Sequence, residues 1–392
     1  MLKSNLLSRQ DFVLILLLFL TELTRSAFFL TFWPLYAVNF LNTSVASAGM
    51  VVSAHYLTET IFKTAVGCQL DRRGKPVLLG GLLLSLLSLL GFYYRREAWV
   101  MVVLAGLFGL GFAPVWLAVI SRVAPIDHPD RAARMGAVFS AWLLGAGAGP
   151  VAINFVLPAG FRTAFQLLII VWALCLAIGL LIPLQAKTGC IKISLSDQLK
   201  KLAADPMVIK VLLPGMFLQT TAASLLLPIL PLYATGVLGL SSRQYGWLLT
   251  AGGAATVLFL VPMGKLVDRL PLKKVLTTGF LLSALFLSLF PLTKKLPVIM
   301  LLAILVGLSY AIVLPAWNSL LARAIPPEQQ ATGWGIFTTL EGLGIATGPV
   351  LGGVISVWLH PTGAIYLSAF ILAGMGFFYL CHPFDRTLSN QE

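Results

Sequence analysis

Charged residues are scarce in this sequence. Asp, Glu, Lys and Arg make up 10% of the 392 residues, whereas hydrophobic residues make up 58% and the mean hydropathy is +0.93. A soluble domain usually has roughly a quarter of its residues charged. This composition excludes an ordinary soluble domain and predicts a membrane protein.

Cysteine is also rare, with only Cys68, Cys175, Cys190 and Cys381. Their spacing matches neither a disulfide framework nor a zinc site, so we expect no disulfide, no metal and no cofactor. The sequence has no phosphate-binding Walker loop, so ATP is not expected to drive it directly. It has no nucleophile and base, or pair of metal ligands, that would indicate an enzyme.

Short alternating strands, the signature of a membrane barrel, are absent. Long runs of Leu, Ile, Val, Phe and Ala favour helices instead, because lipid offers no partner for open backbone groups. A hydrocarbon core about 30 Å thick needs ~20 apolar residues per helix. The sequence divides into twelve such segments, at about residues 12–36, 46–70, 76–94, 98–121, 135–157, 163–184, 207–236, 244–267, 275–292, 297–321, 332–358 and 362–381.

The basic residues are spread through short loops, which argues against nucleic acid as the partner despite a net charge of +13. Nineteen Lys and Arg fall on the side of the N-terminus and six on the other side. The positive-inside rule then places both termini in the cytoplasm, and anionic lipid is a further reason for basic loops. The first apolar run is too long for a signal peptide and contains Glu22 and Arg25, so we expect it in the mature protein.

The two halves of the chain resemble each other at a separation of about 200 residues. Four matches occur in the same order, pairing 34–37 with 231–234, 67–75 with 264–274, 114–116 with 315–317 and 145–150 with 344–349. Six helices separate them, so the halves have parallel orientation. We therefore expect an N-terminal half at 1–184, a cytoplasmic linker at 185–206 and a C-terminal half at 207–392.

These features resemble the major facilitator superfamily along the whole chain. The resemblance rests on two six-helix halves, on the loop Gly67-Cys-Gln-Leu-Asp71-Arg72-Arg73-Gly74-Lys75, and on Gly145-x-x-x-Gly149-Pro150. The second motif is similar to one associated with the proton-coupled antiporters of that superfamily. The resemblance implies the superfamily's fold of twelve transmembrane helices in two pseudo-symmetric halves.

Within the superfamily the sequence is similar to the flippases that move the glycolipid anchor of lipoteichoic acid between leaflets. The segments that carry this likeness are 22–25, 114–116, 140–145, 227–234 and 314–318. Glu341 departs from the pattern, since an amide is expected there. The resemblance implies a lipid-linked sugar as substrate and assigns Glu22, Arg25 and Glu59 to proton coupling.

Ionisable residues inside the apolar segments are candidates for function, because a charge in hydrocarbon costs several kcal/mol unless it is paired or faces water. Glu22 and Arg25 share one face of the first helix, and His55, Glu59 and Lys63 form a stripe at four-residue spacing on the second. We interpret these five residues as the proton-coupling site. The alternatives are a fixed ion pair between the helices and, for Lys63, a side chain that only reaches toward the membrane surface.

A second group of residues suits an amphipathic substrate. Aromatic faces bind sugar rings or lipophilic drugs, while amides and carboxylates orient hydroxyl groups or cations. For each tryptophan, plain packing or an interfacial position is the alternative, and for the carboxylate a structural hydrogen bond. The substrate-binding candidates are Trp116, Trp142, Gln219, Trp317, Asn318 and Glu341.

The loop motif and the glycine motifs suggest moving parts. We interpret Gly67, Asp71, Arg72, Gly74 and Lys75, with Asp268 and Arg269 of the second copy, as a conformational latch; the alternative is a solvated loop. Small residues allow close helix packing and proline bends a helix. Hinges or close-packing points are therefore expected at Gly145, Gly149, Pro150, Gly348 and Pro349.

The sequence thus predicts a monomeric transporter of the cytoplasmic membrane, with protons, membrane lipids and an amphipathic substrate as partners. Alternating access between the halves with proton antiport is the expected mechanism. A glycolipid is the first choice of substrate and a lipophilic drug the second. A receptor built on the same fold is the less favoured class.

Overall fold

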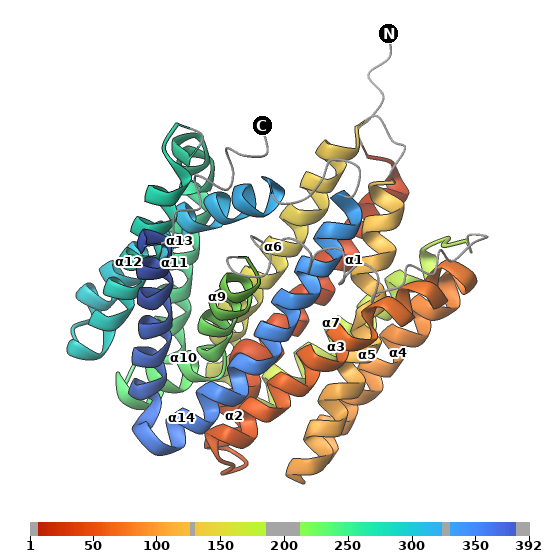
Figure 1. Ribbon diagram of the computed structural model, residues 1–392. Helices are drawn as coiled ribbons and strands as arrows, with labels where there is room; N and C mark the ends of the chain where they lie inside the picture. Colours follow the sequence, from red (N-terminus) through yellow and green to blue (C-terminus); the bar gives the residue numbers. More distant parts are fainter. Residues whose placement is uncertain (1–6, 126–129, 186–211, 268, 324–329, 382–392) are drawn as a thin grey trace. The chain divides into compact units, whose positions relative to one another are not determined.

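The computed structural model describes residues 7–125, 130–185, 212–267, 269–323 and 330–381. These residues form helices joined by short turns and contain no strand (Figure 1). The chain divides into two compact units, Met1–Ile191 and Lys192–Glu392. All of the expected linker except Gln185 lies outside the described residues.

Six membrane-length helical segments make up the described part of unit 1. The first runs from α1 through a short π-helix into α2, and the other five are separate helices. Their bounds are α1 Arg9–Ala27, η1 Phe28–Phe32, α2 Trp33–Asn39, α3 Val45–Arg73, α4 Lys75–Tyr94, α5 Ala98–Val123, α6 Arg131–Val156, η2 Leu157–Ala159 and α7 Phe161–Leu181.

The N-terminus of α1 is fixed by a reciprocal cap. The Asp11 backbone N–H donates to the Ser8 hydroxyl at 3.1 Å, and the Ser8 N–H donates to the Asp11 carboxylate at 2.9 Å. This capping box satisfies two free backbone donors of the first turn. Asp11 also pairs with Arg134 of α6 at 3.2 Å, and Arg134 donates to the Val123 carbonyl that ends α5 at 2.7 Å. The ends of three helices are thereby joined.

Gly74 alone separates α3 from α4. Its φ of 64° and ψ of −125° let the chain reverse within one residue, and its N–H donates to the Leu70 carbonyl at 2.7 Å to close α3. Glycine tolerates a positive φ that a Cβ makes costly. The glycine of the loop motif is thus required by the turn itself.

Aromatic side chains fill the core of unit 1. The ring of Phe28 packs against those of Phe29 and Phe32, and Phe29 meets Phe108 of α5 at 5.3 Å. Trp172 of α7 lies 4.7 Å from Phe108. The pairs are edge-to-face, tilted or stacked, at ring-centre distances typical of aromatic contacts. This packing holds α1 against α5 and α7, and so positions the polar residues of α1.

Unit 2 repeats this plan over its described residues. Its first segment is broken by prolines into α9, α10 and a π-helix, in line with the loss of backbone donors at Pro228 and Pro231. The bounds are α9 Leu213–Leu225, α10 Ile229–Leu232, η4 Tyr233–Val237, α11 Ser242–Val267, α12 Leu272–Leu289, η5 Phe290–Leu292, α13 Leu296–Arg323 and α14 Gln330–Cys381.

The long α14 contains two spans. Its backbone leaves helical geometry at Leu359 and His360, where His360 has a φ of 61°, and Figure 1 shows its two arms meeting at a sharp bend. Pro361 follows directly, and a proline restricts the residue before it to non-helical conformations. The two expected segments at 332–358 and 362–381 are therefore the arms of one kinked element.

Ten described helices are long and apolar enough to cross a membrane. One of these, Thr339–Cys381, covers both arms of α14. The 29-residue α3 is not among the ten, because its polar and ionisable residues lower its hydropathy. With α3 and the second arm added, the described residues supply the twelve expected segments, except that the start of the seventh lies outside them.

The internal copy extends to individual hydrogen bonds. The hydroxyl of Ser26 donates to the Gly145 carbonyl at 3.1 Å, and that of Ser224 donates to the Gly344 carbonyl, also at 3.1 Å. Thr58 binds the Gly106 carbonyl at 2.8 Å, and Thr256 binds the Gly307 carbonyl at 3.0 Å. Hydroxyl–carbonyl bonds between helices are favoured in lipid, where a polar group needs a protein partner. Both units use the same bonds at matching positions.

Candidate functional site

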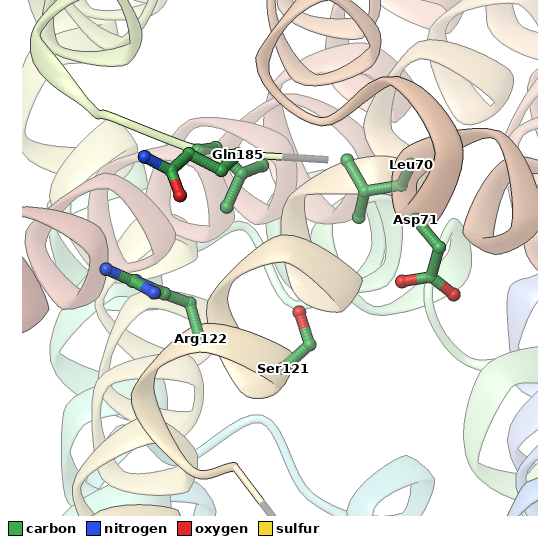
Figure 2. A pocket seen from close by; sticks show the side chains of 6 residues that line it. Leu70, Asp71, Ser121, Arg122 and Gln185 are labelled. Atoms are coloured by element: carbon green, nitrogen blue, oxygen red, sulfur yellow. The ribbon is translucent and has the colours of Figure 1, made fainter. Parts of the chain in front are cut away.

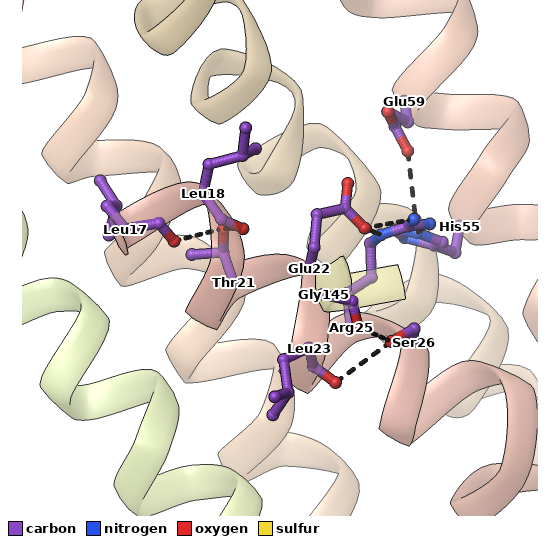
Figure 3. Close-up of polar contacts among 10 residues, drawn as sticks. All are labelled: Leu17, Leu18, Thr21, Glu22, Leu23, Arg25, Ser26, His55, Glu59 and Gly145. Carbon is purple, nitrogen blue, oxygen red and sulfur yellow. Dashed lines mark hydrogen bonds and ion pairs between the residues drawn. The ribbon is translucent and has the colours of Figure 1, made fainter. Parts of the chain in front are cut away.

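A buried ion pair lies near the C-terminal end of α1, in the middle of the continuous span Arg9–Asn39. Nε and Nη2 of Arg25 donate to one oxygen of Glu22 at 3.0 and 2.6 Å (Figure 3). Glu22 is 2% exposed and Arg25 7%. A pair this deep in a membrane helix is costly to desolvate, and breaking it leaves an unpaired buried charge. The two residues expected on one face of the helix do therefore pair with each other.

The stripe on α3 meets this pair. His55 is fully buried, its Nε2 lies 3.5 Å from Nη1 of Arg25, and the same Nε2 lies 3.8 Å from the Glu59 carboxylate. Figure 3 shows the order Glu22, Arg25, His55, Glu59 across the two helices. We refer to these four side chains as the charged cluster. Lys63 has no ion pair with Glu59 within the described part of the chain.

Aromatic rings enclose the charged cluster. The guanidinium of Arg25 lies 5.0 Å from the ring centre of Phe112 and 5.3 Å from that of Tyr56. The imidazole of His55 stacks on Phe29 at 4.2 Å with 9° between the planes. Cation–π contacts strengthen when water is excluded, as it is here. The positive charge of Arg25 is therefore stabilised by the two rings as well as by the Glu22 carboxylate.

Glycines of α6 bring that helix against the cluster. A Cβ added to Gly145 would lie 2.6 Å from the Phe19 carbonyl oxygen and 2.9 Å from the Glu22 Cβ. One added to Gly149 would collide with Ser26 and Leu23. Pro150 follows inside the same helix. These positions act as close-packing points between α1 and α6.

Trp142 extends the site along α6. It lies one helical turn before Gly145, which packs against Glu22, and its ring centre lies 6.1 Å from that of Trp116 on α5. Both side chains are half-buried, so part of each ring remains open. The aromatic pair expected to contact substrate is thus next to the residues expected to carry protons.

The substrate-binding candidates in unit 2 differ in how far their side chains are buried. Glu341 of α14 is half-buried, whereas Asn318 is exposed. Trp317 itself is fully buried among apolar side chains and packs 6.3 Å from Tyr379. Its Nε1, like the Oε1 of Gln219, is buried without a hydrogen-bond partner. Trp317 therefore packs in the core of unit 2, whereas the side chains of Glu341 and Asn318 are at least partly accessible.

An apolar groove of about 370 Å³ lies in unit 2, between α9 and the second arm of α14. Gly215 and Leu218 line it from α9, and Phe370 and Phe378 line it from α14. Its walls suit hydrocarbon rather than a polar group.

The loop after α3 is held within unit 1. Nζ of Lys75 donates to the Leu180 carbonyl in the last turn of α7 at 2.7 Å, a favourable place for a cation. Asp71 and Arg122 line a small cavity of about 30 Å³, which fits one or two waters and no larger molecule (Figure 2). Asp71 has no hydrogen bond or ion pair in the described structure, and Arg72 is exposed.

The remaining latch and hinge residues are placed as follows. A Cβ on Gly67 would lie 3.3 Å from Leu117, so Gly67 packs closely against α5. Arg269 is exposed, and Asp268 lies outside the described residues. A Cβ on Gly348 would collide with Ser224 of α9, and Pro349 follows it inside α14. Gly348 therefore repeats in unit 2 the packing of Gly149.

One expectation was wrong. Cys68 of α3 is disulfide-bonded, whereas Cys175 and Cys381 are free. Cysteine spacing along the sequence gave no signal of pairing, because pairing depends on which segments meet in space.

The sequence also failed to indicate several contributing residues. Tyr56 and Phe112 contact Arg25 through their rings, and Asp11 pairs with Arg134. Tyr56 is adjacent to His55 and so falls off the four-residue stripe. Asp11 and Arg134 are too far apart in sequence for helical spacing to connect them.

Comparison with known proteins identifies the family. The family model described as Major Facilitator Superfamily matches residues 14–201 and 212–391. The chain belongs to the major facilitator superfamily. It is thus a multi-pass membrane transporter, and we refer to it below as the transporter.

Curated relatives cover nearly the whole transporter. The proton-coupled antiporter flippase LtaA of Staphylococcus haemolyticus is 30% identical over 387 residues, which is 95% of this chain and 94% of that protein. LtaA of Staphylococcus aureus strain N315 is 29% identical over 391 residues, with 96% of both chains covered. The resemblance to flippases of this kind is confirmed.

Solved structures share the fold. The nucleoside transporter NupG aligns with a TM-score of 0.77 at 13% identity, covering 95% of this chain and 98% of that one. The human organic anion transporter MFSD10 aligns with a TM-score of 0.65 at 18% identity, covering 95% and 99%. These likenesses support the twelve-helix fold and carry no information on substrate.

Proposed function

We propose that the transporter exchanges protons for an amphipathic glycolipid, which it moves between the leaflets of the cytoplasmic membrane. The observation that carries the proposal is the buried Glu22–Arg25 pair, 2.6 Å apart and in contact with His55. A carboxylate that gains a proton no longer holds the guanidinium, so proton binding and side-chain arrangement are linked at this position.

The difference between the two units supports this assignment. Matching the bonds of Ser26 with Ser224 and of Thr58 with Thr256 aligns the charged cluster with Thr220, Ala223, Gly253 and Val257. None of these four residues is ionisable. The interhelical hydrogen bonds are thus repeated in both units, whereas the charged cluster occurs in unit 1 and not at the matching positions of unit 2. This difference is expected if the charged residues serve function and are not needed for the fold.

The substrate proposal rests on two tryptophans beside the cluster in unit 1, on the apolar groove of unit 2 and on the relatives. Trp116 and Trp142 present partly open rings that suit a sugar face, and the groove beside Leu218 suits a hydrocarbon chain. Glu341, Asn318 and Gln219 would orient hydroxyl groups. The LtaA proteins carry the name proton-coupled antiporter flippase.

Alternating access would use the two halves, at 1–184 and 207–392, as rigid bodies. Asp71, Arg72 and Lys75 would latch one state on the cytoplasmic side, together with Asp268 and Arg269. Both termini would be cytoplasmic and the working form a monomer. Export of cationic amphipathic drugs is the second candidate, favoured by the accessible carboxylate of Glu341.

Reconstitution into liposomes tests the proposal. With a pH gradient imposed, a fluorescent diglycosyl lipid should change leaflet faster than without the gradient, and Glu59→Gln should reduce that difference. A cationic dye is offered in parallel. Gradient-independent movement of both compounds would overturn proton antiport. Dye export without lipid movement would replace the glycolipid by a drug as the substrate.

A further inference from the structure

The end of α2 lies opposite the start of α1, at the bottom of the view in Figure 1, and aromatic rings gather there. Tyr36 near the end of α2 stacks on Phe40 at 4.9 Å, and both rings meet Phe161 at the start of α7, at 5.7 and 6.1 Å. The rings join two segments that are far apart in the sequence. Phe40 is nevertheless 49% exposed, so this stack reaches the surface.

Three exposed arginines lie on the segments next to this stack, and one of them contacts it. Arg95 and Arg96 lie in the turn between α4 and α5, and Arg162 follows Phe161 in α7. The guanidinium of Arg96 lies 5.9 Å from the ring centre of Phe40. We call Tyr36, Phe40, Arg95, Arg96, Phe161 and Arg162 the arginine–aromatic patch. It brings positive charge and an open apolar ring onto one surface.

The nearby carboxylate of Glu97 attracts Arg95, but it carries one negative charge against the three arginines of the patch. Glu97 accepts hydrogen bonds from its own N–H and from that of Arg96, and these bonds hold its pKa below the ordinary value. Its charge therefore faces the backbone at the start of α5, where a helix N-terminus favours an anion. The three arginines retain a net positive charge.

The patch lies where the spans end, which is the depth of lipid headgroups. Tyr94, next to Arg95, is 76% exposed, as is typical of aromatic residues at the membrane–water interface. Cations are few on this side of the protein, six against nineteen, and half of those six are in the patch. The corresponding turn of unit 2 has Lys294 and Lys295, but no cation–π contact is present there in the described structure.

We propose that the arginine–aromatic patch binds the phosphate of an anionic phospholipid in the outer leaflet. Arg96 and Arg162 bind the phosphate oxygens, a geometry that suits the planar guanidinium. Phe40 and Tyr94 pack against the glycerol and the upper part of the acyl chains. The site is separate from the charged cluster and does not depend on the proposed transport reaction; only the choice of leaflet follows from the proposed topology.

The test measures lipid retention by the full-length transporter. The protein is purified with a mixture of phosphatidylglycerol and phosphatidylcholine, and native mass spectrometry gives the ratio of the two lipids retained. Arg96→Gln and Arg162→Gln are each expected to lower the preference for phosphatidylglycerol about fivefold, the effect of one basic residue at a membrane surface. The double variant should lose more than either single variant.

Arg243→Gln is the matched control, an exposed arginine near the start of α11 with no aromatic contact in the described structure. Phe40→Leu removes the ring that orders Arg96 while keeping an apolar surface, and should lower the preference as well. Melting temperatures should stay unchanged in the arginine variants, because these side chains are exposed. An unchanged lipid ratio in the double variant, or an equal loss in Arg243→Gln, would overturn the proposal.

Discussion

Nε2 of His55 lies 3.5 Å from Nη1 of Arg25, and this contact determines which ring nitrogen carries the proton. An arginine side chain donates hydrogen bonds and cannot accept them, so Nε2 must be the acceptor. The imidazole is then neutral, with its proton on Nδ1. That atom is buried without a partner, which is costly. The contact of Nε2 with Glu59 at 3.8 Å becomes an ion pair only if Arg25 leaves and the ring is protonated.

The protonation of His55 is therefore expected to depend on the position of the Arg25 side chain. His55→Leu removes the acceptor and should abolish the dependence of transport on the pH gradient, while His55→Gln, which keeps an acceptor oxygen, should preserve part of it. The measurement is the pH profile of glycolipid movement in liposomes. His360→Leu, at the exposed bend of α14, is the control. A wild-type profile in His55→Leu would show that the ring only fills space.

Gly149 is expected to be needed for packing and the neighbouring Gly147 not. A Cβ at Gly149 would collide with Ser26 and Leu23, whereas one at Gly147 would have nothing within 4 Å. Gly149→Ala should lower the stability of the protein by about 1–3 kcal/mol, the usual cost of overpacking. Gly147→Ala should leave it unchanged or raise it by up to about 1 kcal/mol through helix propensity.

Thermal unfolding in detergent measures both glycine variants. Equal melting temperatures for the two would contradict the close approach of α1 and α6. The same comparison applies in unit 2, where Gly348 faces Ser224 and Gly374 has open space. A similar difference in melting temperature between Gly348→Ala and Gly374→Ala would show that close helix packing stabilises both units to a similar extent.

Asp71 and Lys75 are expected to behave differently although they lie in one motif. Lys75→Met removes the bond to the Leu180 carbonyl and should lower stability by about 0.3–1 kcal/mol, the value of a cation at a helix C-terminus. Asp71→Asn breaks no contact in the described structure and should leave the melting temperature unchanged while slowing transport. Transport at the wild-type rate in Asp71→Asn would remove this residue from the latch.

Glu341 separates the two candidate substrates. A neutral glycolipid needs a hydrogen-bonding group at this position but no charge, so Glu341→Gln should retain glycolipid movement. A cationic drug needs the charge, so export of a cationic dye by Glu341→Gln should fall at least about tenfold, as for the loss of a charged hydrogen bond worth about 1.5–3 kcal/mol. Asn318→Ala serves as a nearby control that leaves the carboxylate in place. Loss of glycolipid movement in Glu341→Gln would instead indicate that glycolipid transport itself needs the negative charge of Glu341.

The fold was predictable because lipid allows few solutions. Once composition indicates a membrane, backbone groups must bond within helices, and apolar runs of the right length give their positions. The ends of α4 at Lys75 and Tyr94 lie within one residue of the expected 76–94, since Gly74 and Arg95 interrupt the apolar run. The repeated motifs likewise marked residues that the structure joins by matching hydrogen bonds.

Within the site, only contacts between residues of the same helix could be predicted from the sequence. Glu22 with Arg25 and His55 with Glu59 lie three and four residues apart, and these pairs are in contact. Contacts between helices, such as Arg25 with Phe112, depend on helix rotation and packing, which spacing does not encode. Burial of Trp317 was missed for the same reason, because its apolar neighbours come from other helices.

The most direct test of the account is whether Glu22 links proton movement to substrate movement. Proton uptake is followed with a pH-sensitive dye inside liposomes while glycolipid is supplied, for the wild type, Glu22→Gln and Glu97→Gln, an exposed carboxylate. We expect glycolipid to drive proton movement in the wild type and in Glu97→Gln. In Glu22→Gln this movement should be lost, with slow exchange of glycolipid between leaflets remaining. Proton movement at the wild-type rate in Glu22→Gln would contradict the account.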